Sequence, residues 1–223
     1  IKPMLDKGYD VLVLDYNNKR EGGRDYIQRN GYALMEVLNS IPTLYMGSGY
    51  EEHDAIVAGG SMGTQVSRYA LAKAEERGID HNTGLWIAVD GPFVGAHIPW
   101  SLQAFIRLFS EKKNSGAPVS EGAEKLRIGL DSHAARQLLR RSTYLVPDPL
   151  YASYYAEANL LNGPEGLPSK VRTVAIASGS GSGASAGAQT GGNNNIRFAY
   201  LDDIKTKIIW IPYPNFIPPL IPF

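Results

Sequence analysis

The chain has 223 residues, of which 43% are hydrophobic, and this is enough for one sizeable α/β core rather than a disordered or fibrous protein. Lys and Arg total 22 and Asp and Glu total 22, so no excess of positive charge favours binding to nucleic acid or to an anionic membrane. The absence of cysteine excludes disulfides, thiol nucleophiles and cysteine-ligated metals, but it does not indicate a compartment.

Three short apolar runs in the first half predict buried strands. They are YDVLVLD at residues 9–15, residues 55–58, and LWIAV at residues 85–89. Between them, residues 25–39 and 64–77 predict helices, the first capped by Asp25 and the second ended by Gly78. The residues expected to pack these helices on the sheet are Tyr26, Ile27, Tyr32, Ala33, Met35 and Val37 in the first and Val66, Tyr69, Ala70 and Ala74 in the second. This alternation is typical of right-handed βαβ units in a mostly parallel sheet.

The pattern changes in the second half. Residues 98–168 contain helical pieces separated by Gly and Pro, which predicts a helical insertion over one edge of the sheet. Residues 171–177, VRTVAIA, predict a fourth strand that leads into a low-complexity loop at residues 178–195. Residues 196–201 and 207–211 predict two further strands, for which a hairpin is one arrangement.

The two ends of the chain are both expected to be truncated. The chain begins IKPMLDKGYDVLVLDY, without an initiator methionine or a signal peptide, and ends in the proline-rich stretch KIIWIPYPNFIPPLIPF, a poor way to finish a domain. No apolar run reaches the roughly 18 residues that a membrane-spanning helix requires, so no transmembrane segment is predicted.

The pattern G-x-S-x-G occurs twice. The two matches are Gly59, Ser61 and Gly63, and Gly183, Ser185 and Gly187. A nucleophile elbow needs a strand that ends just before the serine and a helix that begins just after it, and Ser61 alone has both. Ser185 lies in the low-complexity loop. Ser61 is therefore interpreted as a nucleophile, and the alternative is a small residue in a tight turn.

The residues around Ser61 fit the chemistry of an elbow. Glycines two positions before and after it let the strand and helix backbones approach without a Cβ clash, in a strained turn that exposes the serine Oγ. The following helix has backbone N–H groups and a partial positive charge at its N-terminus, so the N–H of Met62 is expected to stabilise an oxyanion. Gly59, Ser61, Met62 and Gly63 thus form the centre of the predicted site.

The elbow lies in DAIVAGGSMGTQVSRYALA, and the next strand lies in DHNTGLWIAVDGPFVGAHIP. These segments resemble serine hydrolases of the α/β-hydrolase superfamily, most of all a bacterial lipase-like group related to GPI-inositol deacylases and lecithin:cholesterol acyltransferases. The resemblance covers most of residues 8–183. It implies an α/β-hydrolase-type sheet with helices on both faces, a helical cap at about residues 98–168, and export to the cell envelope or medium. The whole of 1–223 would then be one partial domain. One departure is Phe93, which stands where that group has a histidine in the pattern Asp-x-Pro-His-x-Gly-Ala.

A serine nucleophile needs a base, usually histidine, and a carboxylate that orients the base. In this superfamily the chain order is serine, acid, histidine. Asp90 ends the strand after the elbow helix, at the edge where such sheets gather their sites, and is the expected acid. The alternative is an ordinary turn aspartate before the sequence GP. The loop after the fourth strand has no carboxylate before Asp202 and Asp203, which also favours Asp90.

The base is harder to assign. The histidines are His53, His81, His97 and His133. The first two precede strands and are expected at the edge opposite the serine. The last two follow the acid, and His97 lies on the correct edge, but both also read as ordinary loop or helix-cap residues. The catalytic histidine is therefore expected beyond Phe223, and a hydrolase without activity is the alternative.

Other features have structural interpretations beside functional ones. The aromatic run at residues 144–161 could line an acyl pocket, but packing of the cap onto the core is preferred. Residues 111–113 are interpreted as a solvated face, and Asp202 and Asp203 near residues 193–195 as exposed rather than as a cation site. No P-loop or dinucleotide fingerprint is present, and no metal or cofactor is expected.

The sequence therefore predicts a serine esterase or lipase that hydrolyses a small-molecule or lipid ester through an acyl-enzyme on Ser61, with Asp90 as the acid. The rival hypothesis is a non-catalytic domain that keeps the hydrolase scaffold for binding or for a role at the cell surface. The sequence does not indicate the acyl group, the alcohol or the oligomeric state.

Overall fold

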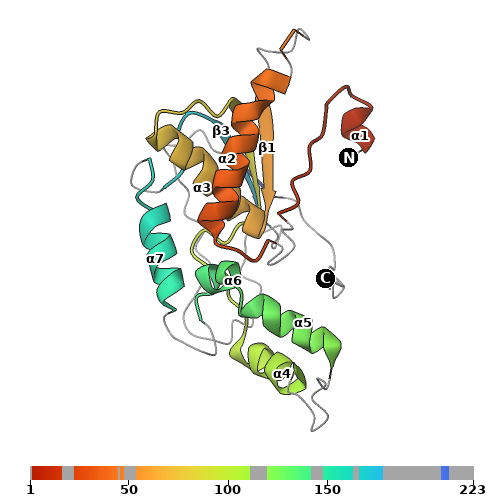
Figure 1. Cartoon of the computed structure of the whole chain (residues 1–223), viewed down its shortest axis with the longest axis vertical. Helices are drawn as coiled ribbons and strands as arrows, with labels where there is room; N and C mark the ends of the chain where they lie inside the picture. Colours follow the sequence, from red (N-terminus) through yellow and green to blue (C-terminus); the bar gives the residue numbers. More distant parts are fainter. Residues whose placement is uncertain are drawn as a thin grey trace.

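The computed structural model describes residues 2–16, 23–44, 46–47, 54–110, 120–141, 148–162, 166–177 and 207–210. Within these residues the chain is a mixed α/β structure with seven helices and one parallel sheet (Figure 1). Some predicted features lie outside the described residues, namely the loop at 178–195 with Gly183, Ser185 and Gly187, the strand at 196–201, residues 111–113 and 144–147, His53, Asp202 and Asp203.

The sheet has its strands in chain order. They are β1 (Ala55–Gly60), β2 (Thr83–Val89), β3 (Arg172–Ala177) and β4 (Lys207–Trp210), and each pairs with the next in parallel. The first three confirm predicted strands. β4 falls within the last predicted strand and pairs in parallel with β3. The possible hairpin involves residues 196–201, which lie outside the described residues. All four carboxyl ends therefore lie at one edge of the sheet.

The predicted strand at residues 9–15 is wrong. These residues follow the short helix α1 (Lys2–Leu5) without regular secondary structure and pair with no strand of the sheet. Leu12 is 64% exposed and Val13 is 69% exposed. An apolar run becomes a strand only where a neighbouring strand pairs with its backbone and a packed layer covers its side chains. Figure 1 shows this segment, in red, running separately from β1.

Helices α2 (Ile27–Leu44) and α3 (Met62–Glu76) pack against each other and form much of the core. The predicted packing residues of α3 are confirmed, since Val66, Tyr69, Ala70 and Ala74 are all buried. α3 ends at Glu76, shortly before the predicted stop residue Gly78, whose φ is +66°.

The predicted packing face of α2 is wrong in part. Two of the predicted residues do pack inward, since Ile27 is buried and Met35 contacts the core, but Tyr32 and Ala33 are exposed. The other buried apolar side chains of α2 are Leu34 and Leu38, which were not predicted. Gly31 fixes the rotation of α2 about its own axis, because a Cβ at this residue would lie 2.7 Å from the ring of Tyr69 in α3. That close approach turns the Gly31 side of α2 toward α3.

The start of α2 also differs from the prediction. Asp25 accepts a hydrogen bond from the N–H of Tyr26 at 2.7 Å and pairs with Arg29, but the helix begins two residues later. Its first N–H, that of Ile27, donates to Oε1 of Gln137 at 2.7 Å. A side chain distant in the sequence thus partners the first amide of this helix.

The described helices cover one face of the sheet. α2 and α3 pack on the face that carries Val57, Trp86 and Ala88 (Figure 1). Side chains alternate along β1, so Ile56 points to the other face, where 47% of it is exposed. The expected helices on both faces are therefore seen on one face only within the described part of the chain.

The predicted insertion contains four described helices in two groups. α6 (His133–Leu138) and α7 (Pro149–Ala158) pack against α3 in a second core that includes Tyr154 and Tyr155. These buried tyrosines confirm the packing interpretation for the described part of the aromatic run. α4 (Trp100–Ser110) and α5 (Glu121–Leu130) form a hairpin beyond α6 (Figure 1). Within the insertion, α7 therefore lies beside α3, while α6, α5 and α4 follow one another beyond one end of the sheet (Figure 1).

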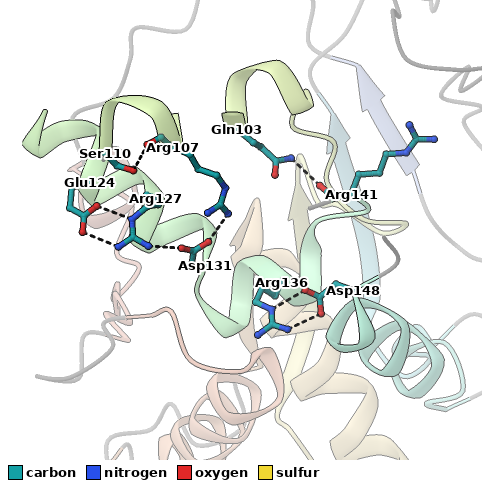
Figure 2. A network of polar contacts seen from close by, with 9 residues as sticks. All are labelled: Gln103, Arg107, Ser110, Glu124, Arg127, Asp131, Arg136, Arg141 and Asp148. Atoms are coloured by element: carbon teal, nitrogen blue, oxygen red, sulfur yellow. Dashed lines mark hydrogen bonds and ion pairs between the residues drawn. The ribbon is translucent and has the colours of Figure 1, made fainter. Parts of the chain in front are cut away.

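Ion pairs connect the α4–α5 hairpin (Figure 2). Asp131, which follows α5, accepts hydrogen bonds from Arg107 of α4 and from Arg127 of α5, each at 2.8 Å. Arg127 also pairs with Glu124 one turn earlier. These side chains are between 21% and 32% exposed, so the contacts are only partly desolvated.

The contacts of α6 and α7 include a buried carboxylate. Asp148 is almost fully buried, caps α7 by accepting from the N–H of Leu150 at 2.9 Å, and pairs with Arg136 at 2.8 Å (Figure 2). The hydrogen bond to Asp148 raises the pKa of Arg136 above its ordinary value. Gln103 Nε2 donates to the carbonyl oxygen of Arg141 at 2.9 Å, which joins α4 to the segment after α6.

Candidate active site

Ser61 connects β1 to α3 in an unusual backbone conformation. Its φ is 49° and its ψ is −117°, and the residue is exposed. A positive φ is uncommon for a residue with a Cβ, and this ψ lies outside the ordinary left-handed helical region. Neighbouring contacts hold the turn: the N–H of Ser61 donates to Val89 O at 2.8 Å, and Ser61 O accepts from the N–H of Thr64 at 3.0 Å. The strand, turn and helix of the predicted elbow are all present.

The two elbow glycines contribute differently. A Cβ on Gly59 would lie 2.3 Å from Gly63 O and 2.6 Å from Ser67 Oγ. A Cβ on Gly63 would meet nothing within 4 Å. The close approach of strand and helix therefore depends on Gly59, and the predicted steric role of Gly63 is wrong.

Met62, the expected oxyanion donor, is the first residue of α3. N–H groups in the first turn have no partner within the helix, and they lie at the positive end of its dipole. The side chain of Met62 is partly buried and packs against the core that α3 shares with α6 and α7. The side chain thus anchors the residue whose backbone amide adjoins Ser61.

Asp90 lies beside Ser61 at the sheet edge. Gly60 pairs with Val89, so Ser61 and Asp90 directly follow paired residues of neighbouring strands. Asp90 is exposed, has a φ of 47°, and donates its N–H to Ile176 O at 2.8 Å. Aspartate is one of the few residue types that adopt a positive φ readily, so this position suits both a turn residue and an acid.

Two tyrosines of α7 hold the loop that follows Asp90. Tyr155 OH donates to Pro92 O at 2.6 Å, and Tyr151 OH donates to Val94 O at 2.9 Å. Burial raises the pKa of Tyr155, so its phenol keeps the proton that it donates. The aromatic run therefore fixes the loop beside the candidate site as well as packing the core.

Phe93 occupies a packing position in the same loop. Its ring meets Trp86 edge to face, with centroids 6.2 Å apart, and lies 5.8 Å from the guanidinium carbon of Arg68. Arg68 is buried, so its guanidinium group makes this cation–π contact away from water. Phe93, which stands in place of the histidine found in the group that the sequence resembles, thus fills space between β2 and α3.

The described histidines lie in three separate places. His81 is buried before β2, at the edge opposite Ser61, with Nε2 3.3 Å from Oε1 of Glu75. His133 begins α6 and stacks on Tyr26 with ring centroids 4.3 Å apart. His97 is exposed in the segment that follows β2. Of these three, His97 follows the strand that ends beside Ser61.

Two hydroxyl groups inside the elbow were missed by sequence reasoning. Thr64 Oγ1 lies 2.7 Å from Gly59 O and 3.2 Å from Val89 O. Ser67 Oγ donates to Gly63 O at 2.8 Å and accepts from Trp86 Nε1 at 2.9 Å. In the sequence they are two hydroxyl residues one helical turn apart just after the motif, and this spacing does not indicate their partners.

The opposite end of α3 carries a buried carboxylate. Glu75 accepts hydrogen bonds from the N–H of Ser169 at 2.7 Å and of Lys170 at 2.8 Å, and also from the amide of Asn162. Burial by itself raises the pKa of Glu75, but these hydrogen bonds outweigh it and leave the pKa below its ordinary value. This cluster joins α3 to the segment before β3, away from Ser61.

The described residues contain no group of three or more His, Asp or Glu side chains that could hold a metal ion. None of the described helices is both long and apolar enough to span a membrane. Comparison of the chain with protein-family models, with curated proteins and with solved structures finds no match.

Proposed function

We propose that this chain acts as a serine esterase or lipase in which Ser61 attacks the carbonyl carbon of a carboxylic ester. The observation that carries the proposal is the backbone of Ser61, which combines φ 49° and ψ −117° with an exposed side chain between a strand and a helix. A conformation of this kind costs about 1–3 kcal/mol and recurs at functional sites, where strain presents a reactive group. Glycine would adopt this backbone conformation without that cost, so a residue that only formed the turn would not need to be serine.

The proposed reaction has two steps. As Ser61 Oγ bonds to the carbonyl carbon, its proton passes to a histidine, and the N–H of Met62 stabilises the charge on the carbonyl oxygen. The ester C–O bond then breaks, and the alcohol leaves with the proton from the histidine. Water attacks the acyl-enzyme, which releases the carboxylic acid and restores Ser61.

Asp90 is proposed to orient the histidine and to stabilise its protonated form. Its position next to Ser61 at the sheet edge supports this role. The base itself is either His97, which follows the same strand, or a histidine encoded beyond Phe223, as the chain order of the superfamily implies. Sequencing of the adjoining coding region and the variant His97→Ala distinguish these two candidates.

The test is labelling by a fluorophosphonate probe in the intact protein, expressed from its complete coding sequence. The probe is expected to modify Ser61, and Ser61→Ala should abolish the modification. Ser101→Ala is the matched control, because Ser101 is also exposed near the start of a helix but lies in α4. Equal labelling of the wild-type protein and Ser61→Ala would refute the assignment. Absence of labelling in the wild-type protein would favour the non-catalytic scaffold instead.

A further inference from the structure

Thr64 connects the turn that holds Ser61 to the turn that holds Asp90. Its hydroxyl lies 2.7 Å from the carbonyl oxygen of Gly59 in β1 and 3.2 Å from that of Val89 in β2. We infer that Thr64 is a positioning residue, which sets the separation of the nucleophile and the acid in the reaction proposed above. The inference rests on that proposed function.

The carbonyl group of Val89 is the point at which the two turns meet. It accepts the N–H of Ser61 at 2.8 Å and lies within hydrogen-bond distance of the Thr64 hydroxyl. The same peptide unit continues directly into Asp90. A change in the contact between Thr64 and Val89 would therefore move the Ser61 turn relative to the Asp90 turn.

The methyl group of Thr64 contacts the acid turn from a second direction. A Cβ on Gly91, the residue after Asp90, would lie 2.3 Å from Thr64 Cγ2 and 2.8 Å from Thr64 Cβ. Thr64 is fully buried, so water does not take the place of either contact. The hydroxyl and the methyl group thus hold the strand ends and the glycine at fixed distances.

The simpler alternative is that Thr64 only satisfies a backbone carbonyl, as many buried threonines do. Thr83 is a matched example of that role. It is 6% exposed and donates its hydroxyl to His81 O at 2.9 Å, at the edge of the sheet opposite Ser61. Removal of the Thr83 hydroxyl should affect stability but should leave Ser61 and Asp90 in place.

The experiment compares Thr64→Val, Thr64→Ser and Thr83→Val in the intact protein, with p-nitrophenyl butyrate as the substrate. Thr64→Val keeps the shape of the side chain and removes the hydroxyl. It should lower kcat about 10- to 100-fold with KM unchanged, because a displacement of about 1 Å between reacting groups has an effect of this size. Thr64→Ser restores the hydroxyl and should recover most of kcat. Thr83→Val should keep the wild-type kcat.

A second pair of variants keeps the test valid if Thr64→Val does not fold. Gly91→Ala introduces the Cβ that would press on Thr64 Cγ2, and the backbone of Gly91 does not have a positive φ. It should lower kcat without changing KM. The double variant with Thr64→Ser lacks Cγ2 and should recover part of that loss. Such coupling is not expected from two independent sites.

The outcomes separate this inference from the proposed function. If the wild-type protein neither hydrolyses the ester nor reacts with a fluorophosphonate, the proposed function fails. If the wild-type protein is active but Thr64→Val has the wild-type kcat, or loses no more than Thr83→Val, Thr64 does not position the reacting groups. A fall in kcat that Thr64→Ser does not recover would also overturn the inference.

Discussion

The two ends of helix α3 are built in opposite ways. At its N-terminus, Ser61 has a positive φ and an exposed side chain. At its C-terminus, the Glu75 carboxylate is completely buried and accepts hydrogen bonds from two backbone amides and from side chains of the neighbouring segment. One end holds a strained residue with its hydroxyl available to a ligand, and the other end leaves its charged group no access to solvent.

This difference indicates how one helix can carry a strained residue at one end and still be held firmly in place. A strained backbone conformation persists only when contacts elsewhere over-determine the structure. Here the contacts of Glu75 fix the far end of α3, and the packing of Tyr69 and Ala70 fixes its middle. Variants at the two ends should therefore differ in the sign as well as the size of their effect on stability.

The largest effect is expected at Glu75. Glu75→Gln replaces one acceptor oxygen by an NH2 group that faces backbone N–H donors, and should lower the free energy of unfolding by about 3 kcal/mol. Glu76→Gln is the control, because the Glu76 side chain is 41% exposed and its ion pair with Lys73 lies at the surface. Urea unfolding measures both. A loss at Glu75 no greater than that at Glu76 would show that the buried cluster does not anchor α3.

The next largest effect is expected at Gly59. Gly59→Ala places a Cβ 2.3 Å from Gly63 O and should destabilise the protein by about 1–3 kcal/mol, as over-packing does. Gly63→Ala meets no atom and should be neutral or stabilising by up to about 1 kcal/mol, since alanine favours the helix. Thermal unfolding checks the pair. The reverse order of stabilities would contradict the assigned close approach.

Acid should weaken the Glu75 end by a smaller amount, because protonation leaves the carboxyl group in place. The pKa of Glu75 is below its ordinary value of 4.5 in the folded state, so the unfolded state takes up the proton first as the pH falls. The stabilisation is complete above that ordinary value and is lost as the pH falls through the folded pKa. Urea midpoints between about pH 7 and pH 3 should fall less steeply for Glu75→Gln than for Glu76→Gln.

At the strained end the expected change is a gain. Ser61→Gly should raise the free energy of unfolding by about 1 kcal/mol, because relief of strain exceeds the extra entropy of the unfolded glycine chain. Ser61→Ala keeps a Cβ in the same conformation and should show no such gain. Both variants lose fluorophosphonate labelling under the proposed function. Calorimetric midpoints that place Ser61→Gly below Ser61→Ala would argue against backbone strain at this residue.

The smallest effect is expected in the α4–α5 hairpin, where the charged groups are partly solvated. Asp131→Asn weakens the pairs with Arg107 and Arg127 and should cost about 0.5–1 kcal/mol, with a smaller difference from wild type at high salt. Glu75→Gln should keep its effect at high salt because its contacts are buried. A salt dependence shared by both variants would remove this contrast.

The sequence predicted the β1, α3 and β2 unit because its signals are local. Alternating and continuous apolar runs, the G-x-S-x-G motif and Gly78 all act within a few residues of the structures that they specify. The strand at residues 9–15 could not be decided in this way, because a strand depends on a partner that is distant in the chain. The packing face of α2 likewise depends on the contact of Gly31 with Tyr69, which no periodicity within α2 reveals.

For the candidate site too, the sequence predicted the local features but not the contacts between elements. The motif and the chain order placed Ser61 and Asp90 at neighbouring strand ends, as the structure has them. Thr64, Ser67 and Tyr155 were not predictable, because a hydroxyl group looks the same in sequence whether it bonds to its own helix or to another element. Their hydrogen bonds to Val89, Trp86 and Pro92 cross between elements.

The positive φ of Asp90 limits which substitutions this position can accept. Asparagine and glycine keep that backbone, whereas β-branched and bulky residues strain it regardless of their charge. A saturation library at this codon would therefore mix loss of a carboxylate with loss of the turn. Asparagine separates the two, because it keeps the turn and removes the carboxylate.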